Sequence, residues 1–111
     1  MRNIAPRPRQ MELLSFRPIR KNSLRGFCSV QLPNGLLIHD IPVLCSHGKY
    51  WATLPSKPMI DSAGIVLRDD AGKIRYGVVN EWPTPDLQHE FSKRVVTLIR
   101  AQYPNALEGG S

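Results

Sequence analysis

Two pairs of adjacent residues carry the side chains best suited to chemistry, Ser56 with Lys57 and His39 with Asp40. A serine–lysine nucleophile needs the lysine amine near the serine oxygen, usually from another turn or strand, and adjacent residues of an extended loop do not provide that. Neighbours on a strand point to opposite faces, so His39 and Asp40 should not meet side chain to side chain. We expect one of these two to be buried against backbone partners and the other to lie at a sheet edge. We therefore expect neither pair to be catalytic.

Lys57 is better suited to binding an anion. Pro55 cannot donate to a strand ladder and Pro58 keeps the preceding residue extended, so the sequence predicts a stiffened loop. A restrained lysine loses less entropy on binding, and the hydroxyl of Ser56 can donate to a phosphate oxygen beside it. The alternative is a solvated turn with an incidental lysine.

Signatures of cofactor and metal sites are missing from the sequence. It has no GxGxxG, GxxxxGK[ST] or HExxH motif, and neither Cys28 nor Cys45 has a second ligand at zinc-site spacing. Both cysteines lie in apolar runs, so we expect two reduced core thiols, although the even count leaves a disulfide open. We expect no enzymatic activity, no cofactor, no metal and no small-molecule substrate.

Positive charge gathers at the N-terminal end of the chain. The 111 residues carry 15 Lys and Arg against 9 Asp and Glu, a net charge of +6. Residues 1–25 hold seven basic side chains and one acidic side chain, which leaves the remainder neutral. A basic segment attracts polyanions, and nucleic acid is the commonest polyanion in a cytoplasm. The alternative is that this charge only keeps the chain soluble.

The composition divides the chain into one domain with loose ends. Residues 1–10 are rich in proline and arginine and are expected to be a flexible basic arm. Residues 11–104 form a single domain, residues 105–111 form a disordered tail, and we find no internal repeat. No run approaches the roughly 18 apolar residues of a membrane span, and the N-terminus lacks the apolar segment of a secretory signal. We expect a cytoplasmic protein with no membrane partner.

The elements that must position these residues are a strand meander and one helix. Four strands are expected where apolar runs alternate with the turns KNS, PNG and SHG, over 11–19, 25–32, 36–44 and 49–54. After a loop over 55–62, the turn at 69–72 predicts a further hairpin. The fold class is therefore α+β, an antiparallel meander of about five to six strands with a C-terminal helix packed on it.

The helix has clear boundaries. Thr84-Pro85-Asp86 supplies an N-cap, a proline at the first helical position and an acid in the first turn, and Tyr103-Pro104 ends the helix. Val96 is expected on the outer side with Lys93 and Arg100. One apolar stripe should pack on the sheet, formed by Leu87, Phe91, Val95, Leu98 and Ile99.

Four segments of the chain carry a family likeness: MELLSFR at 11–17, the run 27–44 with IHDI at 38–41, ATLPSK at 52–57, and Tyr76 with the strand and helix that follow. Together they resemble the SpoVG family, the small bacterial stage V sporulation and septation regulators. They are similar, in order, to its opening strand, its VHDI core, its AMPSK/R signature, and its closing strand and helix. The likeness spans residues 11–103.

The resemblance implies an antiparallel sheet with a C-terminal helix, a homodimer, and site-tolerant binding to DNA and possibly RNA with regulatory consequences. It implies no enzymatic activity. By position, Lys57 is the basic residue of the signature, and Lys93, Arg94 and Arg100 occupy the basic stretch of the helix. Together with the basic cluster at 17–25, the predicted nucleic-acid contacts are Arg17, Arg20, Lys21, Arg25, Ser56, Lys57, Lys93, Arg94 and Arg100.

The sequence also departs from the family pattern. Pro58-Met59-Ile60 is apolar where the family has charge and a glycine, Gly77 stands where the family has an acid, and residues 1–10 have no counterpart. An apolar loop suits a protein better than a phosphate. The alternative function is therefore a protein-interaction module that does not bind nucleic acid directly.

Aromatic side chains leave two interpretations open. Tyr50, Trp51, Tyr76 and Trp82 are candidate platforms for unpaired bases, as on other sheet-based single-strand binders. The alternative is packing in the core, which the sequence favours for Trp51.

Overall fold

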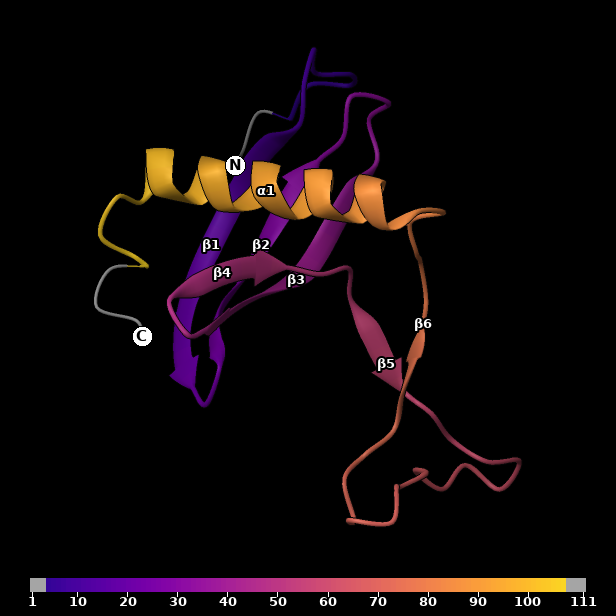
Figure 1. Ribbon diagram of the computed structural model, residues 1–111. Coiled ribbons are helices and arrows are strands. Elements are labelled where there is room, and N and C mark those ends of the chain that lie inside the picture. Colours follow the sequence, from indigo (N-terminus) through magenta and orange to yellow (C-terminus); the bar gives the residue numbers. More distant parts are fainter. Residues whose placement is uncertain (1–3, 108–111) are drawn as a thin grey trace.

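The computed structural model describes residues 4–107. These residues form a four-stranded antiparallel sheet, a helix across one of its faces, and a two-stranded arm that projects from the sheet (Figure 1). The sheet follows the chain order, with strands β1 Glu12–Lys21, β2 Leu24–Gln31, β3 Leu37–Ser46 and β4 Lys49–Ala52. The arm and the helix are β5 Ser56–Pro58, β6 Tyr76–Val78 and α1 Pro85–Gln102. The predicted α+β meander with a C-terminal helix is confirmed.

Tight turns join the strands where the sequence predicts them. His47 and Gly48 have φ angles of +53° and +79°, the left-handed pair that a two-residue hairpin loop requires between β3 and β4. The segment after β4 differs from the prediction. Ser56–Pro58 was expected to be a loop, but it is a strand that pairs with β6. Pro58 is tolerated there because each strand of a two-stranded ribbon has one unpaired side.

The helix begins and ends as predicted. The hydroxyl of Thr84 accepts a hydrogen bond of 3.2 Å from the N–H of Leu87, with Pro85 and Asp86 in the first turn. At the other end, the N–H of Tyr103 donates to the carbonyl of Ile99 over 2.7 Å and closes the last turn. In residues 4–107, no helix combines the length and the hydrophobicity that crossing a membrane requires.

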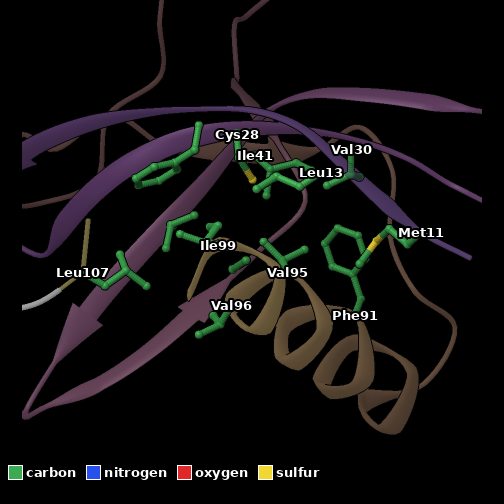
Figure 2. Close-up of a cluster of buried hydrophobic side chains, with 13 residues drawn as sticks. Met11, Leu13, Cys28, Val30, Ile41, Phe91, Val95, Val96, Ile99 and Leu107 are labelled. Carbon is green, nitrogen blue, oxygen red and sulfur yellow. The ribbon is translucent and has the colours of Figure 1, made fainter. Parts of the chain in front are cut away.

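The core lies between α1 and the face of the sheet that it covers (Figure 2). Val30, Ile41 and Val43 from the sheet and Val95 and Ile99 from the helix are each 0% exposed. Complete burial of side chains of this size contributes roughly 1.5–3 kcal/mol each, so this layer holds the helix against the strands.

Two residues of the helix differ from the prediction. Val96, expected on the outer side, is 6% exposed and belongs to the core cluster, so that expectation is wrong. Leu87, expected in the packed stripe, is 42% exposed. Val96 is buried because the helix contacts both β1 and β4, so a wider part of the helix surface than a single stripe packs on the sheet.

The arm contains an eight-residue repeat, which the sequence analysis missed. Met59, Leu67 and Arg75 lie eight residues apart and form a closed ring of backbone hydrogen bonds. The N–H of Met59 donates to Arg75, that of Arg75 to Leu67, and that of Leu67 to Met59, over 2.8, 3.0 and 2.9 Å. Each unit between ring members is a small hairpin that begins and ends on the ring.

The two hairpins of the repeat have matching turns. Asp61 Oδ1 accepts hydrogen bonds from the N–H groups two and four residues later, over 2.8 and 3.0 Å, and Asp69 Oδ1 does so over 2.9 and 3.0 Å. Gly64 and Gly72 close the turns with φ angles of +80° and +81°. Both turns are therefore built in the same way, with an aspartate that accepts hydrogen bonds from its own turn and a glycine in the left-handed conformation.

Parts of both predicted ends pack on the domain. The carbonyl of Ala5 accepts a hydrogen bond from the side chain of Gln31, and Pro8 is buried. Leu107 is 4% exposed, and its carbonyl accepts a hydrogen bond from the hydroxyl of Tyr50. Residues 1–3 and 108–111 of the predicted arm and tail lie outside the described residues.

Candidate nucleic-acid interface

The sheet has an open face on the side away from α1. Side chains alternate along a strand, so the neighbours of core residues such as Phe16, Cys28 and Val43 point to this side. We define the open face by the side chains of Ser15, Arg17, Phe27, Ser29, Pro42, Leu44 and Trp51. The register places these residues beside one another, since Ser15 pairs with Ser29, Arg17 with Phe27, Phe27 with Pro42, and Leu44 with Trp51.

An arginine and an aromatic ring lie together on the open face. The guanidinium carbon of Arg17 lies 5.8 Å from the centroid of the Phe27 ring. Arg17 is exposed and Phe27 is half-buried, so this cation–π pair is accessible from solvent.

A groove runs between the open face and the base of the arm, and we call it the sheet–arm groove. A smaller hollow, lined by Ser15 and Ser29, adjoins it, and Arg17, Phe27 and Asp40 line both. The residues that line the groove are Arg17, Phe27, Asp40, Pro42, Leu44, Thr53, Pro55, Ser56 and Tyr76. One arginine, one aspartate, two aromatic rings and two hydroxyl side chains therefore share one concave surface with apolar residues.

A β-bulge places Asp40 in this groove. Cys28 pairs with Ile41 and Val30 with Ile38, so one residue of β2 lies opposite two residues of β3. Asp40 is one of those two, and it has a left-handed φ of +57°. A bulge redirects side chains because its extra residue interrupts the alternation of the strand.

The bulge overturns the expectation for His39 and Asp40. Neither is buried, since both side chains are exposed. They also share one side of the sheet. Nδ1 of His39 lies 2.9 Å from the hydroxyl of Ser29 on the open face, and Asp40 lines the groove.

The predicted nucleic-acid contacts do not all come together in the described chain. Arg17 and Ser56 line the sheet–arm groove, whereas Lys57 alternates with Ser56 and points to the other side of the arm. Arg20 and Lys21 are exposed near the turn between β1 and β2. The contacts predicted on α1 are Lys93, Arg94 and Arg100.

Arg25 has a structural position. It is 8% exposed, and its Nη1 donates to the carbonyls of Asn22 and Leu24 over 2.8 and 2.9 Å. These bonds tie the guanidinium to the turn between β1 and β2.

The basic residues of α1 are exposed on a different side of the molecule from the groove. Nε of Arg94 lies 3.6 Å from a carboxylate oxygen of Glu90 one turn earlier. Lys93 and Arg94 line a hollow beside Met11. The guanidinium of Arg100 lies 5.3 Å from the ring centroid of Tyr50. α1 thus carries a basic surface that is separate from the sheet–arm groove.

The aromatic candidates separate into packed and available rings. Tyr50 lies under Arg100 and bonds to Leu107, and the Trp82 ring packs 5.3 Å from Phe91. Tyr76 is 59% exposed and lines the groove. Trp51, for which the sequence favours the core, is half-buried and pairs with Leu44 on the open face.

Phe27 was missed by the sequence analysis as a candidate contact. A phenylalanine in a strand with Cys28 and Val30 looks like a core residue. Its pairing with Arg17 is the signal that distinguishes it, and that pairing depends on the register of β1 against β2.

The described residues offer little for metal or thiol chemistry. In residues 4–107, no three potential metal-ligating side chains come together. Cys28 and Cys45 are both free and buried, and burial raises the pKa of the Cys28 thiol to about 12. A thiol with so high a pKa is a poor nucleophile at neutral pH.

Comparisons of the chain with protein-family models, with curated proteins and with solved structures found no match.

Proposed function

We propose that this chain is a cytoplasmic nucleic-acid-binding regulatory protein of the SpoVG type. In this proposal it acts as a homodimer and binds DNA, and possibly RNA, with low sequence specificity. The observation that carries the proposal is the sheet–arm groove, where exposed Arg17 lies over Phe27 opposite Ser56 and Tyr76. The net charge of +6 adds a general attraction for polyphosphate.

The groove provides the groups that nucleic-acid binding needs. A guanidinium forms charge-assisted, often bidentate, hydrogen bonds to phosphate, and a serine hydroxyl donates to phosphate oxygens. Aromatic faces stack on bases of any type. Arg17 and Ser56 supply the first two contacts, while Phe27 and Tyr76 supply the third. Such contacts give affinity without strong sequence preference, as the proposal requires.

The test is a binding titration at two salt concentrations against duplex DNA, single-stranded DNA and RNA. Binding should weaken steeply with salt, because each neutralised phosphate releases counterions. Arg17→Ala changes the basic side chain of the groove and should weaken binding to all sequences more than Lys57→Ala or the double variant Arg20→Ala/Lys21→Ala, which change residues outside the groove lining. Absence of binding by the wild type at low salt would refute the proposal.

The proposed homodimer is supported by the arm. Large apolar side chains of the arm are exposed, Ile60 at 60%, Ile65 at 64% and Val78 at 70%. Ile60 lies opposite Val66, which is 38% exposed, in an antiparallel bridge, and contiguous exposed apolar side chains mark interaction surfaces in soluble proteins. Sedimentation of the wild type should give a dimer mass, and the double variant Ile60→Ser/Ile65→Ser should shift it toward the monomer.

The same arm favours the second candidate function, a protein-interaction module. An apolar projection is better suited to a protein than to phosphate, whereas the groove also holds the guanidinium of Arg17 and the hydroxyl of Ser56, which can bind phosphate. A pull-down before and after nuclease treatment separates the two functions. A partner that is retained after nuclease and lost with Ile60→Ser/Ile65→Ser favours the interaction module.

A further inference from the structure

We infer that the sheet–arm groove takes an unpaired base and prefers bases that carry an exocyclic amino group over thymine and uracil. The inference rests on the proposed function and names the ligand that the same surface would select. Three residues carry it: Arg17, Phe27 and Asp40, which line both the groove and the hollow beside it.

The aromatic content of the groove favours single strands. A base in a duplex is stacked on its neighbours, so its face cannot reach an aromatic side chain on a protein surface. In a single strand the face is free to stack on Phe27, on the guanidinium plane of Arg17, or on Tyr76. The chemistry of these side chains therefore points to unpaired nucleotides.

Asp40 is out of place in a groove that only binds phosphate. Its carboxylate would repel the phosphate backbone of a nucleic acid. The β-bulge nevertheless brings this carboxylate beside Arg17 and Phe27. It also holds a left-handed φ of +57°, which few residues other than glycine adopt, although aspartate and asparagine do so more readily than most. Bulges and uncommon backbone conformations concentrate at binding sites, where they direct a particular side chain.

An ionised carboxylate only accepts hydrogen bonds, so it selects bases by their donors. Cytosine and adenine each present an amino group, and guanine presents an amino group beside a ring N–H. Thymine and uracil have a single ring N–H between two carbonyl oxygens, and these oxygens repel a carboxylate. Asp40 therefore discriminates among bases while Arg17 and the aromatic rings hold the strand.

The experiment measures fluorescence anisotropy of the full chain with labelled oligocytidylate, oligoadenylate and oligothymidylate of about a dozen nucleotides. We expect the wild type to bind the first two about tenfold more tightly than oligothymidylate at the same salt concentration. Asp40→Asn keeps the shape of the side chain and tolerates the left-handed backbone, but it removes the negative charge. It should reduce this preference severalfold and strengthen oligothymidylate binding, a gain that a misfolded variant could not produce.

Two further variants complete the design. Asp70→Asn makes the same charge change in the exposed turn at 69–72, away from the groove, and should leave the preference unchanged. Phe27→Leu keeps an apolar side chain but removes the stacking surface, so it should weaken binding of all three oligonucleotides by about tenfold.

The outcomes separate the inference from the proposed function. Equal affinity of the wild type for the three oligonucleotides, or equal effects of Asp40→Asn and Asp70→Asn, overturns the inference and leaves nucleic-acid binding intact. Tighter binding of a duplex than of its separated strands also overturns it. No binding to any nucleic acid at low salt refutes the proposed function, and the inference with it.

Discussion

The hydroxyl of Ser92 in α1 accepts a hydrogen bond of 2.9 Å from the backbone N–H of Ala52 in β4. β4 is an edge strand of the sheet, with only β3 beside it. Unpaired groups on such an edge are a template for pairing with other chains. The helix therefore covers the core and also satisfies a backbone donor at the edge.

Ser92→Ala should destabilise the domain by about 1–3 kcal/mol, because the Ala52 N–H would lose its acceptor in a partly buried place. Chemical denaturation monitored by circular dichroism measures the loss. Ser62→Ala changes an exposed hydroxyl in the arm and should shift stability by less than about 0.5 kcal/mol. Equal effects of the two changes would show that the hydrogen bond between Ser92 and Ala52 contributes nothing to stability.

Gly26→Ala should be among the most damaging single methyl additions. A Cβ at this position would lie 2.6 Å from the carbonyl oxygen of Arg17 and 2.7 Å from the ring of Phe16. Relief requires movement of the β1 backbone, so we expect a loss of about 2 kcal/mol or more. Gly48→Ala is the comparison, with no described atom within 4 Å of its Cβ but a φ of +79°, and should cost only about 1 kcal/mol. Thermal unfolding of both variants distinguishes crowding from backbone strain.

Arg17→Ala should affect nucleic-acid binding and not stability, whereas Arg25→Ala should affect stability and not binding. Arg17 is exposed in the groove, so its loss should weaken nucleic-acid binding and reduce the salt slope by about one phosphate contact, with little change in stability. Arg25 bonds to the carbonyls of its own turn, so its loss should lower stability by about 1–3 kcal/mol and leave the slope unchanged. A reduced salt slope in Arg25→Ala would place that residue in the interface instead.

The thiol of Cys28 should make stability fall at high pH. Burial raises its pKa from the ordinary value of 9.0 to about 12, so between these values the thiol ionises in the unfolded chain first. Its contribution to stability is complete below pH 9 and is lost as the pH rises toward 12, by at most about 1.4 kcal/mol per pH unit. Denaturant midpoints at about pH 8 and about pH 10 measure the fall, which should be smaller in Cys28→Ala. The same fall in both proteins would assign the effect to other groups.

The parts of the fold that local chemistry determines could be predicted from the sequence. Thr84-Pro85-Asp86 starts a helix because the cap, the fixed proline φ and the acid satisfy the first N–H groups. The turn at His47 and Gly48 is equally local. The order of the strands in the sheet could also be predicted, because strands joined by tight turns pair with their neighbours in the chain.

The interface depends on relations between strands, and these could not be predicted. Whether Phe27 faces the core or solvent depends on register, and the bulge at Asp40 breaks the alternation that placed it opposite His39. Val96 is buried because the helix contacts β1 and β4 together. The repeat in the arm was overlooked because its units share only a few side chains, and its backbone ring involves residues that differ in every unit.

That ring has a consequence for how the arm can vary in length. Deletion of residues 60–67 would join Met59 directly to Arg68. Met59 already pairs with Arg75, and Arg68 already pairs with Ile74, so the two pairs would form one continuous antiparallel ladder. The projection can therefore lengthen or shorten by whole modules while the sheet at its base stays undisturbed. The same junction is a natural place to graft a foreign peptide.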